Sequence, residues 1–289
     1  MEKKFANLHF HSTHSDGAYT PAELVAVGKE EGYKALVLAD HDVATGVPEL
    51  MALCKENGLD SMMGTEFTCE GFGQCFHMLG YDYDPNHHEM AAMLRYLSDK
   101  ATFLAREQFD YCIAKGYLQD ITWDEVVAHN PGLTWFCNEP VFRTMKAKGQ
   151  ITDVEYWGFF KHFREYTPKF NPYRMPTAET MIGLIRAAGG VPVLAHPHNQ
   201  IRYLDSLVEM GLMGVECSHH LLTEEEEIAF RAMAKKHGLY VTGGSDHHGL
   251  MGGISTSRYP DGNNPHACPP LAFGVTEEEY FCLKERRLG

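Results

Sequence analysis

Apolar and polar positions follow two different patterns along the first 84 residues of the chain. Short strand-like runs such as ANLHF, KALVLAD, SMMGTEFTC and CFHMLGYDY stand beside longer runs with helical spacing, TPAELVAVGKEEG and PELMALCKENG. Strands that take turns with helices are typical of βα units and of a largely parallel sheet. The pattern therefore predicts an α/β fold in this segment.

The ends of the helical runs carry residues that favour helix boundaries. Thr20 is placed as an N-cap, Pro21 as the first helical residue and Glu23 as the capping-box partner of Thr20. Gly32 and Gly58 follow the two runs and favour helix termination. We therefore expect a helix to begin at Pro21, and each of the two helices to stop at its glycine.

The alternation disappears between residues 85 and 174, where runs such as HEMAAMLRYLSDKATFLAREQFDYCIAKG predict helices in succession. It resumes with an amphipathic helix over residues 177–188, followed by VPVLAHP, MGVECS, TEEEEIAFRAMAKKHG and LYVTGGSDHHG. The stretch YPDGNNPHACPP, residues 259–270, predicts a turn-rich crossing. We therefore expect one discontinuous α/β domain, residues 1–84 and 175–289, with a helical insertion at 85–174.

Composition narrows the class of protein. A chain of 289 residues with 44% hydrophobic content can form one large domain, or one domain plus an insertion. The 25 Lys and Arg against 39 Asp and Glu give a net charge of −14, which disfavours the wrapping of long duplex nucleic acid. No stretch approaches the roughly 20 apolar residues of a membrane helix, so we expect a cytoplasmic protein without a membrane partner. The oligomeric state is left open.

The eight cysteines contain no C-x-x-C pair. Neither a zinc ribbon nor a disulfide framework is therefore indicated, and we expect reduced, mostly buried thiols.

The 17 histidines cluster instead of scattering, and they do so where predicted strands end. Imidazoles and carboxylates stand at these ends: His9, His11, Asp40, His41, Asp42, Glu66, His77, His196, His198, Asp246, His247 and His248. The carboxyl ends of parallel strands meet at one edge of a sheet, so these groups are expected to share one polynuclear site. Such ligands without thiolate suit Zn²⁺, Mn²⁺ or Fe²⁺.

A single histidine at a strand end is more often a satisfied polar group than a metal ligand. The same trait at several independent strand ends makes coincidence a poor explanation for the set. His9 and His11 stand two residues apart, so on a strand both project to one side and can reach one ion.

Several neighbours of these residues have more modest expected roles. We expect Asp40 and Asp42 to orient neighbouring histidines rather than to bind metal. His14 and His247 are expected to be loop residues or to support the ligands.

The strand MGVECS contributes a further group of residues. His219 and His220 follow it, and either could protonate a leaving group. Glu216 and Ser218 at the same strand end are expected to contact ligands or metals indirectly.

The motifs HFHSTHSDG, ADHD, the Glu of GTEF, AHP and GSDHH resemble, in order and spacing, those of the PHP (polymerase and histidinol phosphatase) family of metal-dependent phosphoesterases. The resemblance covers residues 7–84 and 176–249. The helical block resembles the insertion of the branch that includes bacterial nucleotide phosphatases and small 5'-to-3' exoribonucleases. The resemblance implies a distorted (β/α)7 barrel whose insertion covers the active-site mouth, and a centre of three divalent metal ions, Mn²⁺, Fe²⁺ or Zn²⁺.

Carried over motif by motif, the resemblance implies a ligand set for each ion. The sets are His9, His11, Glu66 and Asp246 for one ion; Glu66, as a bridge, with His77 and His196 for the second; and Asp16, His41 and His248 for the third. Of these, Glu66, Asp246 and His248 are the expected catalytic residues. Because every ligand position of the family is occupied, the resemblance favours an active enzyme.

The implied activity is hydrolysis of phosphate esters through a metal-bridging hydroxide, with a small nucleotide or the end of a short oligonucleotide as substrate. Two alternatives stay open. One is a phosphatase for small metabolites such as histidinol phosphate, and the other is a metal-binding regulatory domain without turnover.

Four basic or imidazole residues are the expected substrate contacts: Arg143, Arg202, His198 and His220. Relatives often carry an Arg-Pro-His stretch that leads to a second arginine, whereas residues 137–143 read CNEPVFR and keep only Arg143. Because a guanidinium can bind a phosphate through two parallel hydrogen bonds, we expect Arg143 and Arg202 to bind a second anionic group of the substrate.

Overall fold

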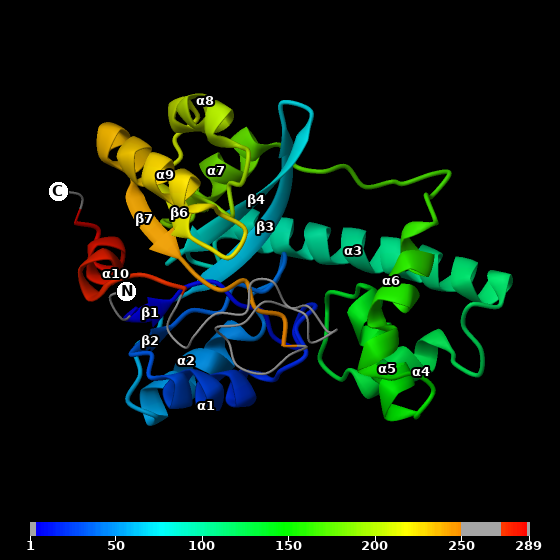
Figure 1. The fold of residues 1–289 in the computed structure, drawn as a ribbon. Coiled ribbons are helices and arrows are strands. Elements are labelled where there is room, and N and C mark those ends of the chain that lie inside the picture. The colour runs from blue at the N-terminus through cyan, green and yellow to red at the C-terminus, as the bar shows by residue number, and fades with distance from the viewer. Residues whose placement is uncertain (1–3, 250–272, 288–289) are drawn as a thin grey trace.

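The computed structural model describes residues 4–249 and 273–287, and Figure 1 shows their arrangement. The strands form a two-stranded parallel sheet, β1-β2, and a five-stranded sheet in the order β3-β4-β5-β6-β7. Their bounds are β1 Ala6–Asn7, β2 Ala35–Leu36, β3 Gly64–Gly71, β4 Gln74–Tyr81, β5 Val191–Leu194, β6 Gly214–Ser218 and β7 Tyr240–Gly243. The structure is therefore a mixed α/β fold, as the alternation of runs predicted.

The expectation of a largely parallel sheet is only partly correct. β5, β6 and β7 run parallel, but β4 is antiparallel to both of its neighbours, β3 and β5. The reason is the connection between β3 and β4, where Phe72 and Gly73 both have positive φ, 51° and 70°. A two-residue turn with this backbone matches the twist of a hairpin and can only reverse the chain.

Hydrogen bonds join the two sheets at both edges. The amide of Leu8, just after β1, donates to the carbonyl of Gly243 in β7 at 3.1 Å. On the other side His41, beyond β2, forms a parallel bridge with Glu66 in β3. The segments that follow β1 and β2 therefore lie between β7 and β3, and their side chains reach the same space.

Helices cover both sheets, as Figure 1 shows. α1 (Pro21–Glu31) and α2 (Val47–Glu56) cover the β1-β2 side, and α10 (Glu277–Lys284) packs beside β7. The predicted start of α1 is confirmed, because Thr20 and Glu23 form a capping box. The predicted end is confirmed as well, since Gly32 caps the helix with φ 99°.

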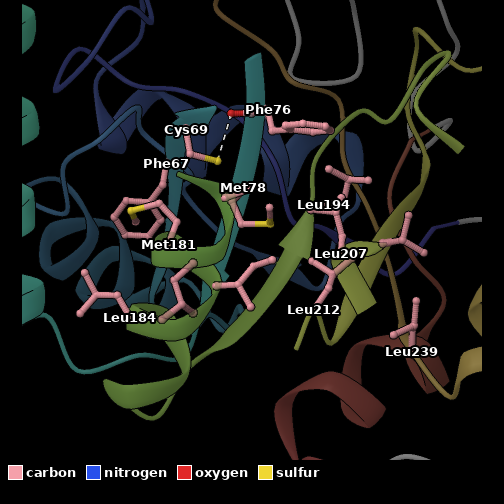
Figure 2. Packing of buried hydrophobic residues seen from close by; sticks show 14 of the residues in the cluster. Phe67, Cys69, Phe76, Met78, Met181, Leu184, Leu194, Leu207, Leu212 and Leu239 are labelled. Atoms are coloured by element: carbon pink, nitrogen blue, oxygen red, sulfur yellow. Dashed lines mark hydrogen bonds between the residues drawn. The ribbon is translucent and has the colours of Figure 1, made fainter. Parts of the chain in front are cut away.

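The five-stranded sheet packs against α7 (Ala178–Ala187), α8 (Leu204–Glu209) and α9 (Glu224–His237), with a short 3-10 turn at Ile201–Tyr203. Figure 2 shows Phe67 of β3 and Met78 of β4 lying against Met181 and Leu184 of α7. These side chains are 9% exposed or less, so this face of the hairpin is part of the main core. The opposite face of the hairpin carries Glu66 and His77, next to Leu79 and Tyr81 of a second core.

Between β4 and α7 the chain forms helices: α3 (His88–Lys115), α4 (Trp123–His129), α5 (Asn138–Ala147), a 3-10 turn at Asp153–Glu155, and α6 (Tyr156–Arg164). The first part of α3 contributes Met90 and Leu97 to the main core. Its second part contributes Phe109 and Cys112 to a separate core with α4, α5 and α6. Figure 1 shows α3 running from the sheet to this helical group. The exact insertion boundaries, 85 and 174, stay a prediction.

Two further expectations concern the described residues. Seven cysteines are free thiols, four of them buried, which agrees with the expected reduced state. None of the helices in the described ranges has the length and apolarity that a membrane crossing requires. The expected turn-rich stretch at 259–270 lies outside the described residues.

Candidate metal centre

Imidazoles and carboxylates from both sheets converge at one place. The segments after β1, β2, β5 and β7, together with the facing parts of β3 and β4, bring together His9, His11, Asp16, His41, Glu66, His77, His196, Asp246 and His248. Most of these residues belong to small groups that share members, and within each group the ligand nitrogens and oxygens all lie within 4.8 Å of one another. Every residue expected to bind metal therefore belongs to this one cluster.

The first group surrounds the inner oxygen of Glu66. Oε2 of Glu66 lies 3.2 Å from Nε2 of His9 and 3.3 Å from Nε2 of His11. Oδ1 of Asp246 lies 3.6 Å and 3.0 Å from the same two nitrogens. Two imidazoles and two carboxylates thus point at one small volume, which is the donor set expected for the first ion.

The second group faces the other oxygen of the same carboxylate. Oε1 of Glu66 lies 2.9 Å from Nδ1 of His77 and 2.8 Å from Nε2 of His196. The two imidazole nitrogens are themselves only 3.1 Å apart. Glu66 therefore stands between two groups of histidines, as the expected bridge requires.

The third group lies around Asp16. Oδ2 of Asp16 is 3.2 Å from Nε2 of His248 and 3.8 Å from Nε2 of His41. Nδ1 of His248 donates to the carbonyl of Asp246 at 2.8 Å, so the proton of a neutral ring stays on Nδ1. Nε2 of His248 then carries a lone pair directed at Asp16, the form in which imidazole binds metal.

Backbone strain marks two of these positions. His196 has φ 26° and Asp246 has φ 50°, values that side-chain-bearing residues adopt rarely. Gly244 is needed beside them, because a Cβ there would meet Cβ of His9 at 2.3 Å. Strained backbone of this kind persists where the surrounding structure fixes it, and it is concentrated at functional sites.

The charges of the cluster favour a cation. Burial opposes protonation of His9, yet Glu216 and Glu66 raise its pKa well above the usual value. Burial acts to raise the pKa of Glu66, but the imidazoles lower it well below its usual range, so Glu66 is ionised. Burial lowers the pKa of His41 to about 3, which keeps that ring neutral and able to bind metal. The carboxylates therefore give the site a negative potential that favours positive charge, and His41 stays a neutral ligand.

The donor atoms fit bound metal by a second criterion. Buried polar atoms in proteins nearly always have hydrogen-bond partners. Nε2 of His9, Nδ1 of His41 and Oε2 of Glu66 are buried and make no hydrogen bond within the described ranges. Atoms of this type, gathered in one cluster, are the expected ligands of a divalent ion.

Glu216 of β6 supports the first group, in agreement with the indirect contact expected for it. Its oxygens lie 3.1 and 3.2 Å from Nδ1 of His9, and Oε2 also accepts the amide of His196 at 2.7 Å. Because Glu216 is fully buried and ionised, Nδ1 of His9 must donate to it, so Nε2 is the nitrogen that faces the cluster as an acceptor when the ring is neutral.

His219 approaches Asp246 from the same strand end. Its Nδ1 accepts the amide of Leu221 at 3.1 Å, so the proton of a neutral ring is on Nε2. That nitrogen lies 3.5 Å from Oδ2 of Asp246. His219 thus presents a donor to the outer oxygen of Asp246, whereas Oδ1 faces the first group. His220 lies beside it, with Nδ1 3.0 Å from the carbonyl of Ser245.

The expected role of Asp40 and Asp42 is wrong in one respect. Asp40 accepts hydrogen bonds from the hydroxyls of Ser12 and Ser15 at 2.7 and 2.6 Å, and Asp42 accepts the amide of Thr68 at 2.8 Å. Both carboxylates therefore hold backbone segments that carry ligands, and the interactions they make orient loops rather than imidazole rings. The repeated serines of HSTHSDG were the signal for the Asp40 contacts.

His198 and Arg202, the other two residues expected to bind substrate, contact neighbouring protein side chains. His198 is hydrogen-bonded to Glu226 at 2.8 Å, near the start of α9. Arg202 is exposed and lies over the ring of Tyr203, 4.8 Å from its centroid. Tyr203 in turn stacks on Phe72 at the turn of the β3-β4 hairpin. Their roles in substrate binding stay predictions.

The insertion reaches the cluster through one residue that sequence reasoning missed. Trp135 is 8% exposed and stacks on the ring of His41, with centroids 6.0 Å apart and planes at 22°. His14, expected as a loop residue, makes a hydrogen bond to Thr45 at 3.1 Å. No local pattern marks Trp135, because its partner stands far away in the sequence.

Comparison with known proteins gives one family. A family model described as PHP domain matches residues 7–167. The chain is 27% identical over 256 residues to a 3',5'-nucleoside bisphosphate phosphatase of Chromobacterium violaceum, covering 84% of this chain and 86% of that relative. It is 28% identical over 269 residues to a 5'-3' exoribonuclease of Haemophilus influenzae, covering 90% and 96%. A solved structure from Bifidobacterium adolescentis, described as a metal-dependent phosphoesterase, matches with TM-score 0.78 and 25% identity over 99% of this chain and 98% of that one.

Proposed function

Because the chain belongs to the PHP domain family and is a metal-dependent phosphoesterase, we propose that it hydrolyses phosphate esters of small nucleotides or of oligonucleotide ends. The observation that carries this proposal is the buried carboxylate of Glu66, whose two oxygens face separate groups of imidazoles. A bridging carboxylate of this kind suits a polynuclear hydrolytic site.

Three divalent ions fit the three groups of donors. Their proposed ligands are His9, His11, Glu66 and Asp246; Glu66, His77 and His196; and Asp16, His41 and His248. When bound, such ions lower the pKa of a water molecule and neutralise the oxygens of a phosphoryl group. Imidazole and carboxylate ligands are accepted by Mn²⁺, Fe²⁺ and Zn²⁺ alike.

The protein's own residues prepare the site by fixing protons. Glu216 keeps the proton of His9 on Nδ1, and the carbonyl of Asp246 keeps that of His248 on Nδ1. His219 offers its Nε2 proton to Asp246. Each of these contacts fixes which ring nitrogen carries the proton in the neutral imidazole, so the orientation of the ring is set before metal binds.

The substrate part of the proposal rests on the relatives and on the insertion. The two relatives are named for a nucleoside bisphosphate and for the 5'-to-3' degradation of RNA. Trp135 packs against His41, so the insertion lies beside the proposed metal centre, where it can contact a bound substrate.

The fold part of the proposal is a distorted (β/α)7 barrel. The Leu8–Gly243 hydrogen bond and the His41–Glu66 bridge support it, because they connect the two sheets at both edges. In such a barrel the ligands stand where the strands open toward their loops.

A panel of esters tests the function. Mn²⁺-loaded protein would be assayed for phosphate release from adenosine 3',5'-bisphosphate, AMP, histidinol phosphate and p-nitrophenyl phosphate, and for mononucleotide release from a 5'-phosphorylated dinucleotide. We expect the highest kcat/KM with one of the nucleotides. A clear preference for histidinol phosphate would instead identify a small-metabolite phosphatase, and no release from any ester would contradict the proposed catalysis.

A further inference from the structure

The loop that carries Asp16 is closed from its inner side by Asp40. The two oxygens of Asp40 accept the amide and hydroxyl of Ser12 and the hydroxyl of Ser15. The amide of Gly17 returns to the carbonyl of Ser12 at 2.9 Å. A Cβ at Gly17 would lie 2.4 Å from a backbone oxygen, so the loop folds tightly on itself. Asp16 therefore stands on a short, closed turn.

The outer side of this loop is closed by one guanidinium from the insertion. Nη1 of Arg143, in α5, donates to the carbonyl of Gly17 at 2.6 Å, and Nη2 donates to the carbonyl of Thr13 at 3.1 Å. These two carbonyls stand on either side of Asp16 in the chain. One planar cation thus joins both arms of the loop, which a single ammonium group cannot do with the same geometry.

The guanidinium is itself held in place. Oδ1 of Asn130 accepts from Nη2 of Arg143 at 3.2 Å and from Nε at 3.4 Å. Asn130 caps the end of α4. Its side-chain nitrogen Nδ2 donates to the carbonyl of Val126 at 2.8 Å and to the hydroxyl of Thr144 at 3.2 Å. The insertion therefore provides a fixed cation, with its plane set by Asn130, for the loop of Asp16.

We propose that Arg143 is a positioning residue that ties the helical insertion to the Asp16 loop and thereby sets the affinity of the third metal group, Asp16, His41 and His248. This inference rests on the proposed metal centre. It differs from the expectation that Arg143 binds a second anionic group of the substrate, because protein acceptors already engage Nη1, Nη2 and Nε of Arg143. The insertion then completes the metal site as well as covering it.

Two substitutions separate positioning from substrate binding. Arg143→Lys keeps the positive charge but loses the planar set of N–H donors, and Arg143→Ala loses both. Lys146→Ala is the matched control, since Lys146 stands on the same helix and pairs with Asp153 at 2.7 Å on the surface. Each chelator-stripped protein would be titrated with Mn²⁺ by calorimetry, with circular dichroism and thermal unfolding of the stripped proteins as a check of folding.

We expect one class of Mn²⁺ sites in both Arg143 variants to lose affinity by about 10- to 100-fold, the range for residues that orient metal ligands. Excess Mn²⁺ should restore kcat on adenosine 3',5'-bisphosphate and on p-nitrophenyl phosphate to a similar degree. Lys146→Ala should match the wild type in both measurements.

Unchanged Mn²⁺ affinity would overturn the inference. If KM then rose for the bisphosphate alone, Arg143 would be a substrate contact; if nothing changed, it would have neither role. Should Arg143→Ala fail to fold, Arg143→Lys decides by the same comparison. Failure of the proposed function is a separate result, since the wild type itself would then bind no Mn²⁺ or release no phosphate.

Discussion

Replacing Glu216 by Gln changes the support of the first metal group without changing its shape. The carboxylate of Glu216 faces two donors, Nδ1 of His9 at 3.1 and 3.2 Å and the amide of His196 at 2.7 Å. Glutamine offers one acceptor oxygen and one donor NH₂ group in their place. If the oxygen stays with the amide of His196, the NH₂ group faces the Nδ1 proton of His9.

Two N–H donors then face each other. His9 can respond in two ways, and both weaken metal binding. The ring can keep its proton on Nδ1 and lose a charge-assisted hydrogen bond, which is worth about 1.5 to 3 kcal/mol. It can also move the proton to Nε2, which removes the lone pair that faces Glu66. At about 1.4 kcal/mol for each factor of ten, the first outcome alone corresponds to roughly 10- to 150-fold in affinity.

The assay is a Mn²⁺ titration of chelator-stripped protein, together with kcat at saturating Mn²⁺. Glu226→Gln is the control, because Glu226 makes the same kind of pair with His198 at 2.8 Å outside the cluster. We expect Glu216→Gln to lower Mn²⁺ affinity within the stated range, and Glu226→Gln to leave it unchanged. Equal Mn²⁺ affinity in Glu216→Gln and wild type would refute the role assigned to Glu216.

Three further changes test other parts of the structure. Glu66→Ala should remove activity and lower metal content at two sites together, and elemental analysis that returned the full complement would exclude the bridge. Phe163→Ala should cost about 3 to 5 kcal/mol in unfolding free energy, since Phe163 is 1% exposed in the insertion core, whereas Phe170→Ala, at a 74% exposed side chain, should cost little in the same urea titration. Burial acts to raise the pKa of Glu279, but hydrogen bonds from its helix start and from Arg231 lower it, so their contribution to stability is present above the unfolded pKa and is lost in acid. Arg231→Met should therefore lower stability at pH 7, and its difference from wild type should shrink below about pH 4; a constant difference would refute this.

The members of the cluster could be predicted from the sequence because they are encoded locally. His9 and His11 alternate on the segment after β1, and His41, His196 and Asp246 stand in the buried segments that follow β2, β5 and β7. Parallel strands then bring such ends to one edge whatever the rest of the chain does. The helix starts were predictable for the same reason, since a capping box such as that of Thr20 needs only four consecutive residues.

Features that depend on distant contacts could not be predicted in this way. Trp135 contacts His41 and Arg143 contacts Gly17 only because the insertion folds back over the first loop. The antiparallel direction of β4 was not predicted, because the pattern of apolar and polar residues in a strand does not show whether the strand pairs parallel or antiparallel. The direction depends on the backbone conformation of the turn at residues 72–73.

The most direct test of the metal-dependent mechanism is one titration in which bound Mn²⁺ and phosphate release are measured on the same samples. Chelator-stripped wild-type protein would receive Mn²⁺ in steps, with adenosine 3',5'-bisphosphate or the best ester of the panel as substrate. We expect stripped protein to release phosphate only at the background rate, and the rate to rise with bound Mn²⁺ until the cluster is filled. Full phosphate release by stripped protein, or a filled cluster with no release above background, would contradict a hydrolytic metal centre built on Glu66.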